Sequence, residues 1–205
     1  MAQTVEAVVF DIGRVIVQWD LRHLFSRLIH DPQELDWFLA NVVTEEWHFE
    51  HDRGRPLAEI IPERKALFPR HAHLIDAYAE NFLDSIPGPV PGTADLIERL
   101  AQARIPLFAI TNFGADFWKM FRPTASVLDR LDDIVVSGVE RLAKPDPAIF
   151  RLAAARFGHA PEAMLFVDDN LANVISAERD GWQVHHFREA SLLEQDLLER
   201  GLIQP

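Results

Sequence analysis

Runs of consecutive apolar residues alternate with segments of helical periodicity through the second half of this 205-residue chain. Residues 106–111, 134–136 and 164–167 are such runs, and residues 6–12 form a further one near the start. Residues 184–187 are interpreted as a fifth strand. Continuous apolar runs are typical of parallel strands that are buried on both faces, so we expect five strands. Their alternation with helices favours right-handed crossovers. The predicted helices are 93–103, 115–121, 147–157, 171–180 and 191–200.

The region 21–85 shows helical spacing and no convincing strand. Asp31-Pro32 favours a helix start, because aspartate is a good N-cap and proline suits the first helical position. The proline- and glycine-rich segment 87–92 is the strongest break in the chain, and we place a domain boundary there. Further helices are expected at 57–67, which Pro62 opens or interrupts, and at 71–83.

These patterns predict an α/β fold, a doubly wound Rossmann-like parallel sheet with an inserted α-helical cap. We expect residues 1–17 and 89–205 to form the catalytic core and residues 18–88 to form the cap. The insertion follows directly after the first strand, so it would lie over the carboxyl end of that strand as a lid.

Polar residues stand at the ends of three of the predicted strands. Asp11 ends the first apolar run, Thr111-Asn112 ends the second, and Asp168-Asp169 follows the run at 164–167. Ligands of open α/β sheets bind beyond the carboxyl ends of the strands, so we expect these groups at one edge. Lys144, just before Pro145, adds a cation. A nucleophilic carboxylate, a hydroxyl, a cation and an acid pair are the groups needed to transfer a phosphoryl group.

The four segments, in this order and spacing, resemble the haloacid dehalogenase superfamily with a small helical cap after the first motif. The first motif, Phe10-Asp11-Ile12-Gly13-Arg14-Val15, is similar to the Phe-Asp-x-Gly-x-Val of a phosphatase-like group that includes glucose-1-phosphate phosphatases. The resemblance covers essentially the full chain. Each motif is weak alone, but four in order in the expected strand context are specific.

The resemblance implies that Asp11 is the nucleophile, which attacks phosphorus and forms an aspartyl phosphate. Thr111 matches the hydroxyl that holds the transferring phosphoryl group, with Asn112 beside it. Lys144 matches the lysine that neutralises the charges of phosphate and nucleophile. Backbone amides after Asp11 and Thr111 can cradle phosphate. Arg14 is a further candidate for phosphate contact, although a solvent-facing loop arginine is an equal alternative.

The resemblance also implies a magnesium ion. Asp169 matches its direct ligand, Asp168 matches the acid that holds the lysine or a metal-bound water, and the backbone carbonyl of Gly13 would bind the ion together with Asp11. The chemistry agrees, because three converging carboxylates repel one another and one would have its pKa raised without a cation. Magnesium prefers one or two carboxylates with water and phosphate oxygens.

The chain departs from the family pattern at Gly13. The phosphatases of the family usually carry there a second aspartate, which protonates the leaving oxygen and then activates water; its loss should cost roughly 10²–10⁴-fold in rate. Three replacements are open: an activated leaving group, a cap residue, or water held by the metal. In the cap we single out His48 and Asp52 as candidates for this replacement. For any one polar residue of the cap, however, we favour the simpler interpretation that it belongs to a solvated helix face ending in a turn. The polar stretch consists of Glu45, Glu46, His48, Glu50, His51, Asp52 and Arg53, with Trp47 among them.

Composition limits the partners. The 20 basic and 32 acidic residues give a formal net charge of −12, which argues against general nucleic-acid or anionic-membrane binding. Cysteine is absent, which excludes disulfides, zinc thiolates and thiol catalysis. No apolar stretch approaches the ~20 residues of a membrane span, and no signal segment precedes the first strand. We expect a cytoplasmic monomer or homodimer that binds a small phosphorylated metabolite.

Other aromatic and imidazole groups have simpler explanations. The pairs His48/His51 and His71/His73 lack a persuasive four-ligand metal set, and we expect surface histidines. The aromatic residues are explained equally well by a substrate pocket and by packing of the cap on the core. The tryptophans considered are Trp19, Trp37, Trp47 and Trp118.

Our leading hypothesis is a magnesium-dependent hydrolase of small phosphomonoesters, including sugar phosphates. One alternative is a 2-haloacid dehalogenase, in which Asp11 attacks carbon without a metal; the absence of the second aspartate fits it, but those enzymes carry a bulky aromatic residue at the position of Gly13. The other alternative is a protein that binds a phosphorylated metabolite without turnover.

Overall fold

A five-stranded sheet of parallel strands forms the centre of the computed structural model, which describes residues 4–204. The strand order is β3-β2-β1-β4-β5. Phe10 of the central strand pairs with Ala109 of β2 and Val167 of β4, so the carboxyl ends of these three strands lie side by side. This confirms the predicted doubly wound sheet. The strands are β1 (Ala7–Phe10), β2 (Leu107–Thr111), β3 (Asp133–Val136), β4 (Met164–Asp168) and β5 (Gln183–His186).

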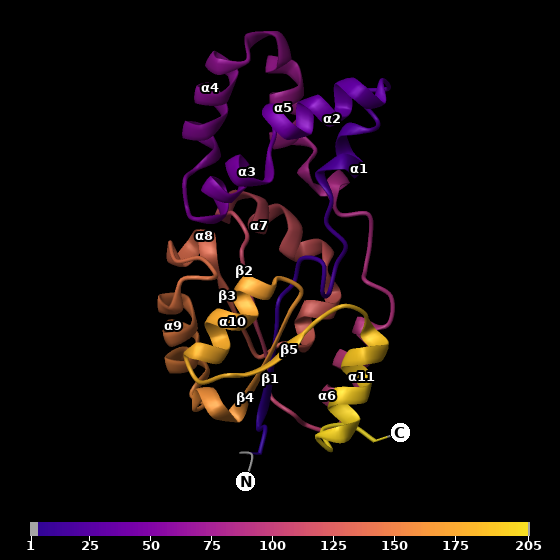
Figure 1. Ribbon diagram of the computed structural model, residues 1–205, viewed down its shortest axis with the longest axis vertical. Helices are drawn as coiled ribbons and strands as arrows, with labels where there is room; N and C mark the ends of the chain where they lie inside the picture. Colours follow the sequence, from indigo (N-terminus) through magenta and orange to yellow (C-terminus); the bar gives the residue numbers. More distant parts are fainter. Residues whose placement is uncertain (1–3, 205) are drawn as a thin grey trace.

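Both faces of the sheet are covered by helices (Figure 1). Successive side chains of a strand point to opposite faces. Accordingly Ala7 and Val9 belong to one buried cluster, with residues of α9 and α10, while Val8 and Phe10 belong to another, with residues of α6 and α11. This two-sided burial explains the unbroken apolar runs of the sequence. The helices are α6 (Thr93–Gln102), α9 (Pro147–Phe157), α10 (Leu171–Arg179) and α11 (Ala190–Glu199).

A group of helices between β1 and α6 stands above the carboxyl edge of the sheet (Figure 1). Here the predicted helix 71–83 is too long, because it ends at Glu80 and a separate 3₁₀ turn follows Asn81. The helix at 57–67 continues through Pro62. The elements are α1 (Leu21–Phe25), α2 (Pro32–Asn41), α3 (Glu45–Asp52), α4 (Leu57–Leu67), η1 (Pro69–His71), α5 (Ala72–Glu80) and η2 (Phe82–Ser85).

Two links join this helical group to the sheet region, and they run side by side. Val17 and Pro89 form an isolated antiparallel bridge, and the backbone N–H of Gln18 donates to the carbonyl of Gly88 at 2.8 Å. The segment rich in proline and glycine is therefore the return link. The remaining elements of the core are α7 (Ala115–Phe121), η3 (Arg122–Thr124), η4 (Ser126–Arg130), α8 (Ser137–Glu140) and η5 (Pro161–Ala163).

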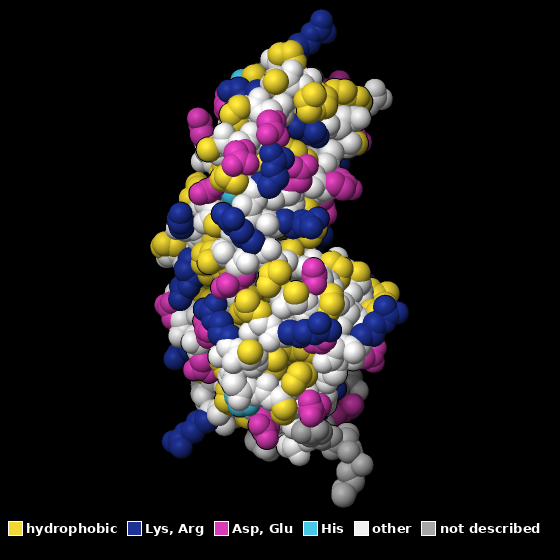
Figure 2. Space-filling view, turned by 90° about the vertical axis from the view of Figure 1, so that its left-hand side faces the viewer, with side chains coloured by type: hydrophobic (Ala, Val, Ile, Leu, Met, Phe, Trp, Pro, Cys, Tyr) yellow, Lys and Arg dark blue, Asp and Glu magenta, His cyan; other side chains and the backbone are white. Residues whose placement is uncertain are grey.

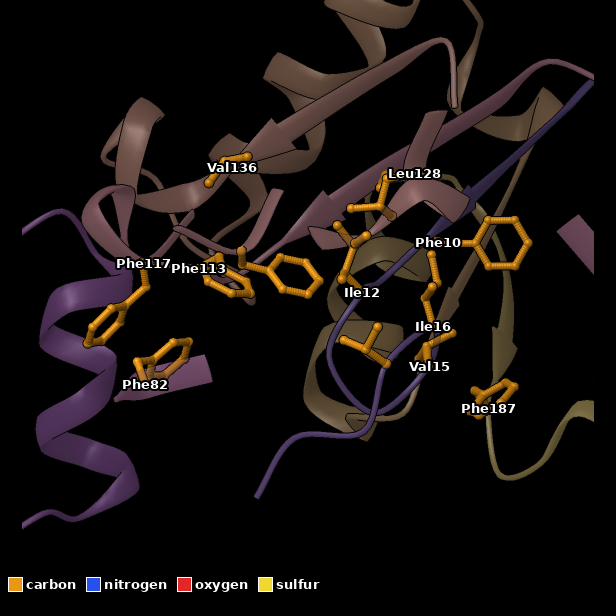
Figure 3. Close-up of a cluster of buried hydrophobic side chains, with 14 of the residues drawn as sticks. Phe10, Ile12, Val15, Ile16, Phe82, Phe113, Phe117, Leu128, Val136 and Phe187 are labelled. Atoms are coloured by element: carbon orange, nitrogen blue, oxygen red, sulfur yellow. The ribbon is translucent and has the colours of Figure 1, made fainter. Parts of the chain in front are cut away.

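Aromatic side chains fill the contact between the helical group and the core. The rings of Phe82, from η2, and Phe117, from α7, stack with centroids 3.8 Å apart and planes 6° apart, and Phe113 meets Phe82 edge-on (Figure 3). Beside them the ring of His51 fills the space over Gly114, where an added Cβ would lie 1.9 Å from its Cδ2 atom. The two parts are thus closely packed, and Gly114 is required by this approach.

The surface is of mixed charge. On the face shown in Figure 2, basic and acidic side chains are interspersed over both parts of the molecule. Among residues 4–204, every helix is too short or too polar to cross a lipid bilayer.

The contact between His51 and Gly114 gives a first prediction. Gly114 has an ordinary extended backbone, with φ −64° and ψ 139°, so Gly114→Ala adds a steric clash without backbone strain. We expect it to lower the free energy of unfolding by about 1–3 kcal/mol, as overpacking does. His51→Ala in the same chain should relieve the clash, so that thermal unfolding of the double variant gives a coupling energy of roughly 1 kcal/mol or more. Additive effects would contradict the close approach.

Candidate active site

Asp11 leaves the central strand at the carboxyl edge of the sheet. Its backbone N–H continues the ladder to the carbonyl of Val167 at 2.8 Å, and only 8% of the residue is exposed. Its Oδ1 accepts the N–H of Ile12 at 2.7 Å and lies 2.9 Å from Nζ of Lys144. Among the described residues none hydrogen-bonds to Oδ2, so this oxygen is the one that can attack a ligand.

Lys144 is the buried cation of the site, with 1% exposed. Its Nζ donates to Asp168 Oδ2 at 2.7 Å and to the carbonyl of Ile110 at 2.8 Å, and it contacts Asp11 as described. The side chain of Asn112 holds the backbone of Lys144 through two hydrogen bonds of 2.9 Å, one to its carbonyl and one from its N–H. Burial acts to lower the pKa of Lys144, but Asp11 and Asp168 raise it by more, so the ammonium group stays charged.

The acid pair ends β4 with two different environments. Asp168 is fully buried, and its carboxylate accepts the backbone N–H of Asn170 at 2.8 Å and the side-chain amide of Asn173 at 3.1 Å, besides Lys144. Asp169 is partly exposed, and burial together with the charge of Asp168 raises its pKa. The carboxylate of Asp168 is thus bound by Lys144 and its neighbours, whereas that of Asp169 is accessible to a ligand.

Three carboxylate oxygens, one each from Asp11, Asp168 and Asp169, lie within 4.8 Å of one another. The pKa of Asp11 is raised to about 7, mainly by burial and also by the charges of Asp168 and Asp169, while Lys144 opposes this shift. One ammonium group therefore does not neutralise the cluster. A hard cation bound by oxygen would, and magnesium is the ion that such a donor set suits.

The other predicted residues surround this cluster. Thr111, at the end of β2, is buried with 1% exposed. Gly13 is partly exposed, and a Cβ added there would meet nothing within 4 Å. Arg14 has a left-handed φ of 60°; its guanidinium contacts Glu45 of α3 at 2.5 Å and lies over the ring of Trp19. The structure therefore brings all the predicted site residues to one place, with Arg14 engaged in a contact to α3.

A pocket of about 400 Å³ opens between the core and the helical group above it. Of the four tryptophans only Trp19 lines it; Trp47 packs on Tyr78 inside the helical group, Trp118 packs on Phe113, and Trp37 is largely exposed. The apolar part of the lining includes Trp19, Phe49, Phe82, Ile86 and Phe113, and the polar part includes Asp11, Arg14, Glu45, Glu46, His48, Asp52, Asn112, Lys144, Asp169 and Asn173.

The expectation that the polar stretch of α3 is a solvated face, with His48 and His51 at the surface, is wrong. Thr44 caps this helix, which turns one face inward, so that His48, His51 and Asp52 are 6%, 1% and 5% exposed. Only its other face, with Glu45 and Glu46, meets solvent. The charged composition concealed this face, because the residues that are buried are themselves polar.

Asp52 lines the pocket, and few hydrogen bonds or opposite charges compensate for the burial of its carboxyl group. Its Oδ2 lies 3.4 Å from Nε2 of His48, and its Oδ1 is buried without a hydrogen-bond partner. Burial raises the pKa of Asp52 to about 7, with His51, the backbone N–H of Gly114 and Lys144 opposing. Burial also lowers the pKa of His48 to about 4, so His48 is neutral near pH 7 and its contact with Asp52 is not an ion pair.

Comparison with known proteins agrees with this geometry. Residues 5–180 match the model of the family described as haloacid dehalogenase-like hydrolase. The chain is 28% identical over 163 residues to validoxylamine A 7'-phosphate phosphatase of Streptomyces hygroscopicus subsp. limoneus, covering 74% of this chain and 75% of that protein. It is 23% identical over 206 residues to sesquiterpene phosphatase astK of Aspergillus oryzae, covering 93% of each.

Solved structures share the fold. A haloacid dehalogenase family enzyme of Bacteroides thetaiotaomicron, solved in complex with magnesium and inorganic phosphate, superposes with a TM-score of 0.70 at 18% identity, covering 90% of this chain and 95% of that one.

The burial of Asp52 predicts a pH-dependent cost to stability. The pKa of Asp52 is raised from 3.8 to about 7 in the folded protein. Between these two values the unfolded chain loses the proton of Asp52 while the folded chain keeps it. Folding therefore becomes less favourable as the pH rises through this range. Asp52→Asn removes this cost. We expect it to raise the free energy of unfolding by roughly 2–4 kcal/mol above about pH 7.5, with a smaller gain near about pH 5.5.

Urea unfolding at the two pH values measures this difference. Asp36→Asn, which changes an exposed aspartate paired with Arg22, is the matched control and should stay within about 0.5 kcal/mol of the wild type. An Asp52→Asn protein less stable than the wild type at both pH values would contradict the buried, uncompensated carboxyl.

Proposed function

Because the chain belongs to the haloacid dehalogenase-like hydrolase family, and is a hydrolase with phosphatase relatives, we propose that it is a magnesium-dependent phosphatase of small phosphomonoesters. The observation that carries the proposal is the position of Lys144, whose ammonium group joins Asp11 to Asp168 within a cluster of three carboxylates. A dianionic phosphate ester needs such positive charge, which a net charge of −12 does not supply elsewhere.

We further propose that residues 1–17 and 89–205 act as the catalytic core and residues 18–88 as the cap. The paired links at Val17 and Pro89 support this division, because they are the connection between the two parts. The arrangement suits a cap that shields the phosphoryl group from bulk water during the reaction.

In the proposed reaction, Oδ2 of Asp11 attacks phosphorus and the bond from phosphorus to the ester oxygen breaks, releasing an alcohol. The product is an aspartyl phosphate, and water then attacks its phosphorus, regenerating the Asp11 carboxylate and releasing inorganic phosphate. Lys144 fixes Oδ1, so that the other oxygen faces the ligand. Thr111 and the backbone amide that follows it hold the phosphoryl oxygens, because the amide after Asp11 already donates to Oδ1 of Asp11.

Asp11 and Asp169, with the carbonyl of Gly13, would hold magnesium, and Asp168 would act through Lys144 or a metal-bound water. The bound ion supplies positive charge to the phosphoryl oxygens. Asn112 acts as a positioning residue for Lys144, since both polar atoms of its side chain bond to the lysine backbone.

The substrate we propose is a small phosphorylated metabolite whose leaving group has both polar and apolar surfaces. The pocket supports this, since its lining combines carboxylates and an imidazole of α3 with aromatic side chains. A sugar phosphate, as in the glucose-1-phosphate phosphatase-like group that the first motif resembles, fits this description. The Streptomyces relative, a validoxylamine A 7'-phosphate phosphatase, also supports a phosphorylated substrate.

The nucleophile assignment is tested by Asp11→Asn. The amide does not attack phosphorus, so phosphatase activity should fall by at least about 10⁴-fold. Circular dichroism should show an unchanged fold. Asp146→Asn, which changes an exposed helix cap outside the pocket, is the control. A purified Asp11→Asn protein that keeps its turnover would show that another group is the nucleophile.

The reaction class is tested by a panel of phosphorylated metabolites, assayed with magnesium and with a chelator. We expect turnover of at least one phosphate ester, lost with chelator and restored by magnesium, because the carboxylate cluster needs the cation. Turnover of 2-chloropropionate in the presence of chelator would instead identify a dehalogenase. Tight magnesium-dependent binding of a phosphate ester without any turnover would identify a binding protein.

A further inference from the structure

The proposed phosphatase reaction needs a proton donor for the leaving oxygen, and the core does not provide one at Gly13. Glycine has no side chain, and the other acids of the core are engaged by the lysine or placed for the metal. The neighbouring cap does carry an acid that faces the same cavity. Asp11 and Asp52 both line this pocket, one from below and one from above.

We propose that Asp52 of the cap is the general acid and base of this enzyme. This inference rests on the proposed function and adds the residue that completes it. Asp52 is 5% exposed, its Oδ1 has no partner, and it belongs to the lining of the cavity that holds the nucleophile. An unpaired oxygen in a buried carboxyl costs free energy, and a ligand oxygen in the cavity would satisfy it.

The backbone of Asp52 is tied to the core rather than to the cap alone. Its carbonyl accepts the hydroxyl of Ser137 at 2.6 Å, and the same hydroxyl accepts the backbone N–H of Phe113 at 2.9 Å. Phe113 directly follows Thr111 and Asn112. One buried hydroxyl therefore fixes the height of Asp52 above the phosphate-binding end of β2.

The side chain of Asp52 is backed by groups that suit both of its protonation states. Nδ1 of His48 lies 2.6 Å from the hydroxyl of Tyr78, and Nε2 faces Oδ2 of Asp52 at 3.4 Å. When Asp52 is charged, Tyr78 donates to Nδ1 and Nε2–H points at the carboxylate. When Asp52 is protonated on Oδ1, the oxygen without a partner, Nε2–H of His48 still faces Oδ2. His48 and Tyr78 are therefore positioning residues.

The charged and titratable groups around Asp52 come from every element packed on it. They are His48 and His51 on α3, Tyr78 on α5, and Lys144 of the core. Of these only Lys144 is charged near pH 7, because burial lowers the pKa of both histidines and raises that of Tyr78. A carboxyl in this setting can exist in both forms near neutral pH, as acid–base catalysis requires.

The proposed steps balance as follows. As the bond from phosphorus to the ester oxygen breaks, the proton of Asp52 moves to that oxygen and the alcohol leaves. Water then attacks phosphorus of the aspartyl phosphate, and one of its protons returns to the Asp52 carboxylate. The bond between phosphorus and Asp11 breaks, inorganic phosphate leaves, and both acids are in their starting states.

The test compares two aryl esters of similar shape, phenyl phosphate and p-nitrophenyl phosphate, in the presence of magnesium. The nitrophenolate leaves without a proton, but phenol needs one. In Asp52→Asn we expect kcat/KM for phenyl phosphate to fall roughly 10²–10⁴-fold, and that for p-nitrophenyl phosphate to fall less than about 10-fold. Hydrolysis of the aspartyl phosphate should be slowed for both, so p-nitrophenolate should appear as a burst of one equivalent per enzyme.

A second variant separates catalysis from a structural role. Gly13→Asp introduces a carboxyl at an open position beside the nucleophile, where the family pattern has its acid. We expect the double variant Gly13→Asp, Asp52→Asn to recover at least about 10-fold of the lost phenyl phosphate activity. Asp36→Asn, an exposed cap aspartate, should match the wild type for both esters.

Three outcomes overturn the proposal. Asp52→Asn retains full activity, or it loses equal factors for both esters without a burst, or Gly13→Asp fails to rescue it in a folded protein. Other results would contradict the proposed function itself. These are a wild type that hydrolyses neither ester, or an Asp11→Asn variant as active as the wild type. Either result would also contradict the proposed role of Asp52.

Discussion

The buried ammonium group of Lys144 is the interaction on which the site depends. It occupies the space between two strand ends and bonds to Asp11, Asp168 and the end of β2 at once. Two aspartates taken out of water on neighbouring strands would repel each other, and removing one partner of a buried charge pair leaves the rest uncompensated. The lysine makes their close approach possible, and the negative charge that remains favours a divalent cation. In the proposed function that cation, together with Lys144, would bind the phosphate.

The second constraint is that the cap must be placed as accurately as the core. This chain does so with close packing and hydrogen bonds, together with the ion pair of Arg14 and Glu45. The stacked rings of Phe82 and Phe117 join the two parts (Figure 3). The ring of His51 over Gly114 and the hydroxyl of Ser137 join them as well. The same contacts therefore position Asp52 over the site.

Most of the sheet could be predicted because its strands are buried on both faces, and an apolar run ending in a polar residue is a strong local signal. The same signal located Asp11, Thr111 and Asp168. Lys144 lies on no strand, so its position before Pro145 and the resemblance to a known family assigned it to the site, without the signal of an apolar run. The structure then showed what holds it in place, the paired hydrogen bonds of Asn112.

The inward face of α3 could not be found by hydrophobic periodicity, because it is built from histidine and aspartate. Its polar side chains are buried against aromatic rings of other elements, and long-range packing of this kind leaves no mark in a local pattern. Ser137 was also missed, although it follows β3 as the other site residues follow their strands. A polar residue directly after a buried strand is the signal that would have found it.

The central claim is that Asp11 carries the phosphoryl group during turnover. Acid quenching of the enzyme during hydrolysis of p-nitrophenyl phosphate, followed by mass spectrometry of its peptides, tests this directly. The account predicts one phosphoryl group on the peptide that contains Asp11, at higher occupancy in Asp52→Asn and absent in Asp11→Asn. Steady hydrolysis with no phosphoryl group on Asp11, or with the group on another residue, would contradict it.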